Sequence, residues 1–406
     1  MPNNNENKIL NVPHLRFPEF TKEWEKCIIG DLATKVGSGV TPRGGESVYK
    51  TYGHPFVRSQ NVGLGHLLLD DIAFIDEETH LRQRNTELKL GDVLLNITGA
   101  SIGRSAIVNK QIVGGNVNQH VCIIRTKENL SSSFLCNFLL SNYGQRQIDS
   151  FQAGGNRQGL NFEQIKSIRI AIPSIGEQNK IAKLLQLIEK RIAIQNKIID
   201  KLQSLIKGLI DDIITSQCAR FVAFETLYSK AGEGGTPTTS NIEFYKNGNI
   251  PFIKIDDLSN KYLVANKDYI TELGLKKSSA WLIPANSIIY SNGATIGAIS
   301  INKYPICTKQ GILGIVPISN IDVEYLYYFM RSSYFQKEVE RVVTEGTMKT
   351  AYLKDINHIK CPIPDLDKQK EISHALSSLS LKEDINVQLL QKYQIQKQYL
   401  LEQMFI

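Results

Sequence analysis

Hydrophobic residues recur at alternating intervals of three and four positions in two long stretches of the chain. The first stretch runs from Glu177 to about Ile214, and the second lies 191 residues later. This heptad pattern predicts two long helices, each packed along a partner helix in coiled-coil geometry. The predicted seam of the first helix contains Leu185, Ile188, Ile192, Gln195, Ile199, Leu202, Ile206, Leu209 and Ile213. The same positions in the second helix are Leu376, Leu379, Glu383, Asn386, Leu390, Tyr393, Lys397, Leu400 and Met404.

The second seam is weaker, because Glu383, Asn386 and Lys397 interrupt it. Gln195 and Asn386 are equivalent, and a buried amide in a seam can fix helix register; alternatively, both face an open stretch or another subunit. Helices of about 38 residues would be about 55 Å long. They could pair antiparallel within the chain or bind separate partners, and intramolecular pairing is favoured by its high effective concentration.

The segments before the two helices carry short β-rich runs bounded by Gly, Asn and Pro, which predict strands and turns. Each segment then has a short helix, near 132–142 and 323–331, and a Pro-marked strand, near 168–173 and 359–364. We therefore predict a mixed α/β (α+β) fold: two duplicated modules separated by two long helices that form an antiparallel coiled coil with pseudo-two-fold symmetry. The predicted modules are 1–176 and 215–367, and the predicted helices are 177–214 and 368–406.

The chain repeats itself once. Gly37–Pro42 returns as Gly232–Pro237, and Gly99–Gly103 returns as Gly293–Gly297, with matching motifs in the same order between and after them. The repeat is half of the chain, so the sequence predicts a duplicated protein and not a solenoid of short repeats.

The net charge of +7 fits an anionic partner without proving one. Hydrophobic residues form 42% and charged residues 21% of the chain, which is ordinary globular composition. The longest apolar runs are too short for a membrane span, and the six cysteines are scattered without a CxxC pair. We expect a cytoplasmic protein without a zinc ribbon or a disulfide framework.

Motifs of common enzymes are missing from the sequence: it has no GxxxxGK[ST] loop, no HExxH and no GxSxG. The histidines show no metal-ligand spacing, and His120 is matched by Gly311 in the repeat. The adjacent acids Asp70 and Asp71 are interpreted as a solvated face or caps. We expect no catalytic residue and no bound metal.

Four pairs of repeated polar loops are candidates for binding. Glycines let a backbone approach a phosphate closely, hydroxyls and cations bind phosphates, and Arg, Gln and Asn can contact base edges. Each loop also has an ordinary structural explanation as a turn. The candidate DNA-binding residues of the first half are Ser38, Thr41, Arg43, Arg58, Gln60, Asn61, Arg104, Asn118, Gln119 and Arg157. Those of the second half are Thr236, Thr238, Lys254, Asp256, Thr295, Lys309, Gln310 and Lys349.

The chain resembles the specificity subunits of type I restriction-modification systems. The resemblance covers nearly the whole sequence and depends on the order and duplication of individually weak motifs. The two halves differ in one of them, since Glu177-Gln178 is replaced by Lys368-Gln369. The motifs are Val12–Phe20 with Trp24, Gly37–Pro42, Gly99–Gly103 and Pro173–Gln178, with repeats that include Asp365–Gln369.

The resemblance implies two target-recognition domains that each contact one half of a bipartite double-stranded DNA site, kept apart by the helices. It implies a non-catalytic subunit that binds two methyltransferase subunits and, through them, restriction subunits. S-adenosylmethionine, ATP and Mg²⁺ would be used by these partners, and no cofactor by this chain. The alternatives are a stand-alone DNA-modifying enzyme and a coiled-coil scaffold that never contacts DNA.

Overall fold

The computed structural model describes residues 11–42, 44–152, 159–216, 220–293, 295–343 and 349–406. By its contacts the chain divides into two units, each of which contains a stretch of both long helices. Unit 1 comprises residues 1–195 and 389–406, and unit 2 comprises residues 196–388. No helix in the described part of the chain is long and apolar enough to cross a membrane.

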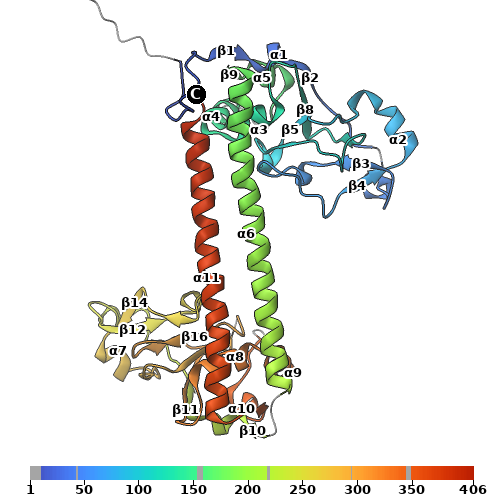
Figure 1. Ribbon diagram of the computed structural model, residues 1–406. Coiled ribbons are helices and arrows are strands. Elements are labelled where there is room, and N and C mark those ends of the chain that lie inside the picture. Colours follow the sequence, from blue (N-terminus) through green and yellow to red (C-terminus); the bar gives the residue numbers. More distant parts are fainter. Residues whose placement is uncertain (1–10, 43, 153–158, 217–219, 294, 344–348) are drawn as a thin grey trace, which may run out of the picture. The chain divides into compact units, whose positions relative to one another are not determined.

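The elements of unit 1 begin with strands and end with the first long helix (Figure 1). The strands are β1 (Glu25–Ile28), β2 (Ala33–Ser38), β3 (His54–Val57), β4 (Ala73–Ile75), β5 (Val93–Asn96), β6 (Ser105–Ile107), β7 (Asn116–Val117), β8 (Val121–Thr126) and β9 (Arg169–Ile172). The helices are α1 (Ile29–Leu32), α2 (Glu77–Arg82), α3 (Ser132–Leu140), α4 (Asn142–Ser150), α5 (Phe162–Ser167) and α6 (Ile175–Ser216), which continues into unit 2.

Unit 2 repeats this order of elements with few changes. Its strands are β10 (Phe221–Ala223), β11 (Tyr228–Glu233), β12 (Ile250–Ile253), β13 (Tyr262–Leu263), β14 (Asp268–Ile270), β15 (Ile288–Ser291), β16 (Ile299–Asn302), β17 (Cys307–Thr308), β18 (Ile312–Pro317) and β19 (Lys360–Pro362). Its helices are α7 (Glu272–Lys276), α8 (Val323–Arg331), α9 (Ser333–Val342), α10 (Leu353–Ile356) and α11 (Leu366–Gln403), whose last part belongs to unit 1.

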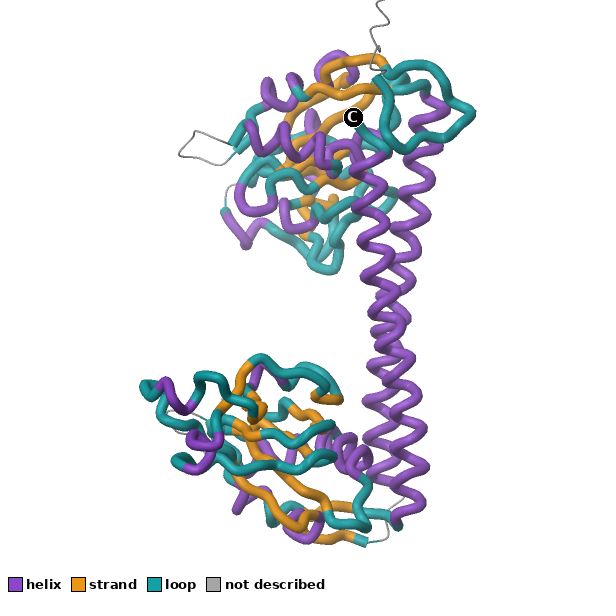
Figure 2. Tube along the Cα trace, turned by 90° about the vertical axis from the view of Figure 1, so that its left-hand side faces the viewer, coloured by secondary structure: helices purple, strands orange, loops and turns teal. Residues whose placement is uncertain are grey.

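The sheets of the two units correspond strand by strand. The larger sheet has the order β2-β8-β5-β6 in unit 1 and β11-β18-β15-β16-β13 in unit 2. The smaller sheet has the order β4-β3-β7 in unit 1 and β14-β12-β17 in unit 2. Even an irregularity is repeated, because the register shifts between Ala33 and Lys35 and again between Tyr228 and Lys230. The predicted duplication and mixed α/β fold are confirmed, and Figure 2 shows the strands lying among helices and loops.

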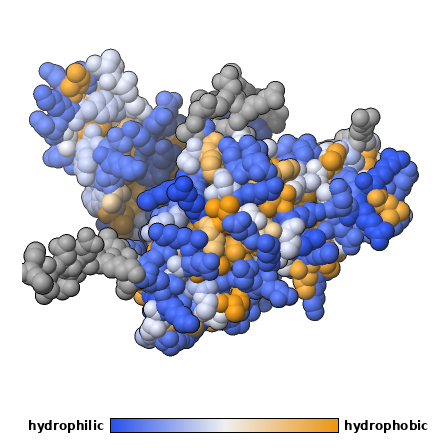
Figure 3. Space-filling model, turned by 90° about the horizontal axis from the view of Figure 1, so that it is seen from above, coloured by the Kyte–Doolittle hydropathy of each residue, from blue (hydrophilic) through white to orange (hydrophobic). Residues whose placement is uncertain are grey.

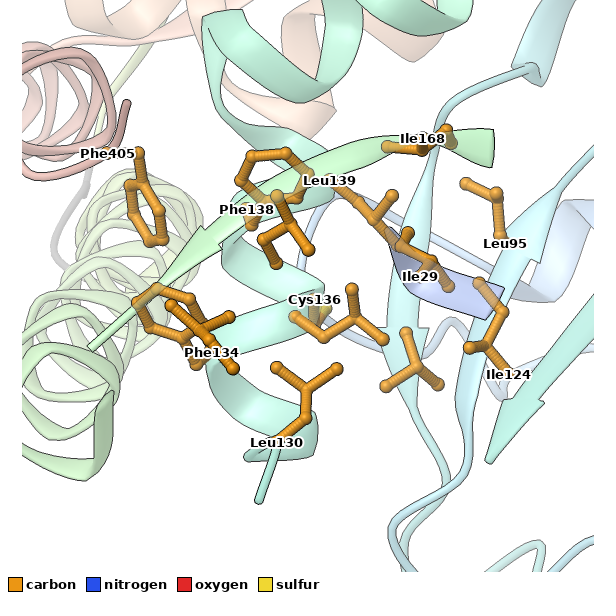
Figure 4. Packing of buried hydrophobic residues seen from close by; sticks show 14 of the residues in the cluster. Ile29, Leu95, Ile124, Leu130, Phe134, Cys136, Phe138, Leu139, Ile168 and Phe405 are labelled. Carbon is orange, nitrogen blue, oxygen red and sulfur yellow. The ribbon is translucent and has the colours of Figure 1, made fainter. Parts of the chain in front are cut away.

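Each unit builds its core from its own module and from a helix end that comes from a distant part of the sequence. In unit 1, Phe405 is fully buried, and its ring centroid lies 5.1 Å from that of Phe134 and 6.3 Å from that of Phe138 (Figure 4). In unit 2, Ile206 and Ile210 of α6 enter the core that also contains the start of α11. Burying apolar side chains of this size is the main source of stability in each unit.

The two long helices run antiparallel in each unit. In unit 1, Glu189 pairs with Lys397, and the Arg191 guanidinium lies 5.8 Å from the ring centroid of Tyr393, so the later residue on α6 meets the earlier one on α11. In unit 2, Gln203 donates a 2.8 Å hydrogen bond to Glu383. The polar interruptions of the second seam at Glu383 and Lys397 are therefore paired across the helices.

The predicted seam of α6 is correct over most of its length. Leu185, Ile188, Ile199 and Leu202 are buried and Ile192 is half-buried, and Gln195 is buried among them. The seam of α11 includes half-buried Leu379 and Leu390 and buried Leu400.

The end of the first seam is broader than predicted. Leu209 is half-buried and packs on the core of unit 2, and Ile210, which was not in the predicted seam, is buried. At this point α6 packs against the core of unit 2 as well as against α11, so the apolar face is broader than a two-helix seam. The side chain of Ile213 lies outside the described residues.

Candidate nucleic-acid interface

Two candidate loops meet at the carboxyl end of a parallel strand pair in both units. In unit 1, β3 pairs with β7 in parallel, and the Asn118 N–H donates a 3.1 Å hydrogen bond to the Val57 carbonyl. In unit 2, β12 pairs with β17 in parallel, and the Lys309 N–H donates a 3.0 Å bond to the Ile253 carbonyl. The loops after these strands are therefore adjacent, as the carboxyl ends of parallel neighbours must be.

A third loop, which follows β2 in unit 1 and β11 in unit 2, lies close against the same strand pair because it has a glycine at the point of contact. A Cβ atom on Gly39 would lie 1.7 Å from the Val117 carbonyl oxygen, and one on Gly234 would lie 2.2 Å from the Thr308 carbonyl oxygen. Any side chain at these two equivalent positions would push the loop away from the strand. The glycines thus explain why the Gly-rich motif occurs in both halves.

The third loop contacts the equivalent glutamine in both units, with donor and acceptor exchanged. The Thr41 N–H donates a 2.8 Å hydrogen bond to Gln119 Oε1, and the Thr41 hydroxyl contacts the same oxygen. In unit 2 the Gln310 N–H lies 3.5 Å from Thr236 Oγ1, at the limit of a hydrogen bond. Threonine and glutamine residues that the sequence aligned in the repeat are therefore neighbours in both units.

The Gly99–Gly103 turn joins this cluster in unit 1. Asn96 Nδ2 donates to the Ser59 carbonyl at 2.8 Å, which links the strand before the turn to the loop after β3. Thr98 Oγ1 lies 2.5 Å from His120 Nδ1, so the turn also contacts the loop after β7. Sequence comparison missed the role of His120 because its counterpart is Gly311, and a glycine carries no side chain to suggest one.

The corresponding turn of unit 2 lies at the same edge. The Asn292 N–H donates to the Gly311 carbonyl at 3.1 Å, and the Ala351 N–H donates to the Asn292 carbonyl at 2.9 Å. Exposed Thr295 lies three positions after Asn292, and exposed Lys349 lies two positions before Ala351. The edge therefore gathers residues that are far apart in the sequence.

The loop after β3 forms a 3-10 turn (Ser59–Asn61) that is closed by Asn61. Asn61 is fully buried, and its Oδ1 accepts a 2.9 Å hydrogen bond from the Arg58 N–H. Asp71 contacts Arg58, Gln60 and Asn61 together. With no exposed surface, Asn61 shapes the loop and has no side-chain atom available to a ligand in this conformation.

Asn118 has a similar internal role. It is buried, and its Oδ1 accepts a 3.1 Å bond from the His120 N–H. Among the other predicted residues of unit 1, Gln60, Arg104 and Gln119 are exposed, and Ser38, Thr41 and Arg58 are half-buried. Arg43 and Arg157 lie outside the described residues.

The predicted residues of unit 2 are exposed. Lys254 Nζ lies 2.9 Å from an Asp268 carboxylate oxygen, and its N–H donates 2.9 Å to Asp257 Oδ2, as Arg58 does to Asn61. The exposed side chains are those of Thr236, Thr238, Lys254, Asp256, Thr295, Lys309, Gln310 and Lys349. Each unit thus presents hydroxyl, amide and cationic groups at one edge, which suits hydrogen bonds to a polyanion.

Cys122 and Cys136 are buried in the hydrophobic core of unit 1. Burial raises the pKa of Cys122 to about 12 and that of Cys136 to about 11, so neither thiol is ionised near neutral pH. Among the described residues, no group of three or more His, Cys, Asp and Glu side chains could hold a metal ion. The face in Figure 3 is mostly hydrophilic, with hydrophobic residues in separate patches.

Unit 2 also contains a groove of about 980 Å³ between the loop before β13 and α11. Half-buried Lys261 lies at its wall, where Nζ contacts Glu324 at 2.9 Å, Ser377 at 2.8 Å and Tyr328 at 3.1 Å. Burial lowers the pKa of Lys261, but these hydrogen bonds outweigh it and raise the pKa above its ordinary value. The lysine is thus a structural cation that joins the module of unit 2 to α11.

Comparison with known proteins gives a family for the whole arrangement. Residues 21–204 and 229–393 each match the model of the type I restriction modification DNA specificity domain, so the two matches cover most of the chain. The putative type I restriction enzyme MjaX specificity subunit of Methanocaldococcus jannaschii is 22% identical, over 95% of this chain and 93% of its own length. The EcoR124I/EcoR124II specificity subunit of Escherichia coli is 30% identical over 46% of this chain and 52% of its own length.

Solved structures share the fold. The S subunit of a type I restriction-modification system from M. genitalium has a TM-score of 0.59 at 14% identity, over 97% of this chain and 99% of that one. A chain from a study of assembly and conformational transition in the type I R-M system has a TM-score of 0.60 at 15% identity, over 94% and 97% of the two chains. The duplicated modules, the two long helices and the two family matches agree: the chain belongs to the type I restriction-modification specificity subunits.

Proposed function

We propose that each unit of this specificity subunit contacts one half of a bipartite DNA target with the edge described above. One observation carries the proposal. The same loops meet at the same edge in both units through the same backbone contacts, whereas many side chains at their tips differ, such as Gln60 and Asp256. A shared frame with different tips is expected if the two edges bind different base sequences.

The exposed side chains divide by chemistry into two proposed roles. Arg104, Lys254, Lys309 and Lys349 are suited to phosphates, which attract cations and fix the position of the protein on the duplex. Gln119 and Gln310 are suited to base edges, because an amide offers both a donor and an acceptor. Thr41 and Thr236 lie against these two glutamines.

Four of the remaining predicted residues are not assigned a direct contact by the proposal. Asn61 and Asn118 shape their loops from inside. Arg43 and Arg157 remain candidates on the sequence alone. The proposed domain limits are those of the sequence: recognition domains at 1–176 and 215–367, and spacer helices at 177–214 and 368–406.

The long helices are proposed to set the distance between the half-sites and to bind the methyltransferase subunits. Each unit has exposed apolar residues outside the helix seam: Leu187 and Ile194 on α6 in unit 1, and Leu381 and Ile385 on α11 in unit 2. Leu187 and Ile194 are one heptad apart and share a helix face, as do Leu381 and Ile385, four residues apart. Exposed apolar stripes of this kind are typical of helix-docking surfaces.

The chemistry of modification and cleavage is proposed to belong to the partners. The methyltransferase subunits would use S-adenosylmethionine, and the restriction subunits would use ATP and Mg²⁺. The chain itself would bind no cofactor and would act on DNA in the cytoplasm.

Lengthening both helices by one heptad tests the spacing role. Seven residues add about 10 Å, which corresponds to about three base pairs. Mapping of methylated bases, with the methyltransferase subunits present, should give the same two half-sites separated by a longer non-specific stretch. An unchanged spacer would refute the proposed spacing role.

Binding to duplex DNA at several salt concentrations tests the contact role. The variants Lys309→Ala and Lys349→Ala should each weaken binding of all sequences alike and lower the salt slope by about one. Lys246→Ala, which changes a lysine elsewhere in unit 2, is the control. DNA binding that does not depend on salt would favour a protein scaffold.

A further inference from the structure

Asp71 is an acid that the proposed contact set does not include. It lies between Asp70 and β4, and the sequence suggests for both acids only a solvated face or a cap. The Asp71 side chain is 58% exposed, yet both of its carboxylate oxygens are engaged by the loop after β3. Asp70, by contrast, is exposed and has no hydrogen-bond or ion-pair partner among the described residues.

Three side chains of the loop, those of Arg58, Gln60 and Asn61, contact Asp71. Asn61 Nδ2 donates a 2.9 Å hydrogen bond to Asp71 Oδ1, and Gln60 Nε2 contacts Asp71 Oδ2. Arg58 Nη2 lies 2.7 Å from the Asp71 carbonyl oxygen and 3.5 Å from Oδ2. Asp71 therefore contacts the side chains of Arg58, Gln60 and Asn61, and so stabilises the 3-10 turn.

Arg58 is further confined from its other side. Its guanidinium carbon lies 5.3 Å from the ring centroid of Tyr49, and its Nε atom is buried without a hydrogen-bond partner among the described residues. Only 21% of the Arg58 side chain is exposed. Gln60 is thus the member of the set with the most freedom to meet a ligand.

The chemistry of the carboxylate decides how Gln60 is presented. An ionised carboxylate only accepts hydrogen bonds, so the Gln60 amide must direct its Nε2 group to Asp71. The Gln60 Oε1 atom then remains available to a ligand as an acceptor, together with the second N–H of Nε2. In the major groove, the donors that such an acceptor can meet are the exocyclic amino groups of adenine and cytosine.

Unit 2 has an acceptor at the same position by a different route. Asp256 replaces Gln60 in the repeat, and it is exposed. A carboxylate needs no partner to orient it as an acceptor. The equivalent loop position therefore presents an acceptor oxygen in both units.

We propose that Asp71 is a positioning residue that fixes the loop after β3 and presents Gln60 Oε1 to the amino group of an adenine or a cytosine in the half-site bound by unit 1. This inference depends on the proposed function, because it specifies which base chemistry one edge recognises. It assigns no direct DNA contact to Asp71.

The test compares Asp71→Asn with Asp70→Asn in the full chain bound to its methyltransferase subunits. Both variants remove one negative charge, so their difference reports the contacts of Asp71 and not the charge. The amide introduced by Asp71→Asn can donate as well as accept, which frees the Gln60 amide to turn over. Competition with duplexes varied at each base pair should show that Asp71→Asn loses discrimination by about tenfold at one adenine or cytosine position.

The other half-site should be unaffected by Asp71→Asn, and Asp70→Asn should discriminate like the wild type at every position. Gln60→Met keeps Asp71 and should lose discrimination at the same position, which excludes an effect of misfolding. The inference is overturned if Asp71→Asn matches Asp70→Asn, or if it weakens binding to all duplexes equally. A wild-type complex that shows no sequence preference would overturn the proposed function itself.

Discussion

In both units a buried glutamine connects the module to the start of its long helix. The residue before this glutamine differs between the units. Gln178 Oε1 accepts a 2.8 Å hydrogen bond from the Ser131 N–H, and its Nε2 donates to the Asn129 and Pro173 carbonyls. Gln369 makes the corresponding three bonds to Asp322, Asn320 and Pro364. This buried glutamine is the shared means of joining a module to its helix.

The preceding residue shows what is particular to unit 1. Glu177 is buried and accepts hydrogen bonds of 2.7 and 2.8 Å from Arg16 and one of 3.2 Å from Trp24. Its counterpart Lys368 is half-buried and pairs with Glu371. The glutamate anchors the segment before β1 to α6, whereas the chain enters unit 2 by another route. The duplicated motif therefore separates into a shared residue and one specific to its place in the chain.

The largest expected effect comes from removing the helix end that completes unit 1. Phe405→Ala deletes a fully buried ring that packs beside Phe134 and Phe138 and leaves a cavity. We expect the free energy of unfolding of unit 1 to fall by about 4 kcal/mol, with unit 2 unaffected. Hydrogen exchange of backbone amides in α3 and α8 measures the two units separately.

The matched control is Tyr399→Ala, which removes an aromatic ring that is 54% exposed on the same helix. It should change the stability of unit 1 by less than about 0.5 kcal/mol. Equal losses of exchange protection in α3 and α8 with Phe405→Ala would show that the two units do not unfold separately.

A smaller effect is expected from the residue that distinguishes the two motifs. Glu177 raises the pKa of Arg16 through its hydrogen bonds, which outweigh partial burial of the guanidinium. Glu177→Gln removes the ion pair and weakens its hydrogen bonds to Arg16, which should destabilise unit 1 by about 2 kcal/mol. Lys368→Gln, the equivalent change in unit 2, should cost less than about 0.5 kcal/mol, because its ion pair with the exposed Glu371 is screened by solvent. Urea unfolding followed by tryptophan fluorescence is the measurement, and a larger loss for Lys368→Gln would contradict the comparison.

The smallest expected effect is a difference between the units in how their stability depends on pH. Burial alone would raise the pKa of Glu324, but hydrogen bonds from Ser377, Tyr262 and Lys261 hold its pKa below the ordinary 4.5. A lowered pKa in the folded state gives stability that is present above the unfolded pKa and is lost as the pH falls through the folded pKa. Unit 2 should lose about 1 kcal/mol more than its Glu324→Gln variant between about pH 5 and pH 3.

Unit 1 has Ser133 at the position of Glu324, so this contribution to the acid response should belong to unit 2 alone. Hydrogen exchange at the two pH values, corrected for intrinsic rates, measures it. Identical acid responses of wild type and Glu324→Gln would show that the hydrogen bonds to Glu324 do not stabilise the unit.

Much of this architecture could be predicted from the sequence. The heptads gave the long helices to within two or three residues at each end, because a repeating apolar stripe spans many positions and tolerates local noise. The duplication predicted that Thr41 and Gln119 should act like Thr236 and Gln310. It could not predict that the two residues of each pair touch, since that depends on the parallel pairing of distant strands.

The roles of individual polar residues could not be predicted. Arg58, Gln60 and Asn61 are nearly adjacent and chemically alike, yet a 3-10 turn buries Asn61 and exposes Gln60. Asp71 has its role only because the chain returns beside that turn. Leu209 and Ile210 show the same limit in a helix, where a second packing partner decides which neighbour is buried.

Mapping of modified bases for Gln119→Ala and Gln310→Ala, each compared with the wild type in the presence of the methyltransferase subunits, tests the central claim most directly. The account predicts that each variant relaxes one half of the target and that the two variants relax different halves. Relaxation of the same half by both variants, or of neither, would contradict the assignment of one half-site to each unit.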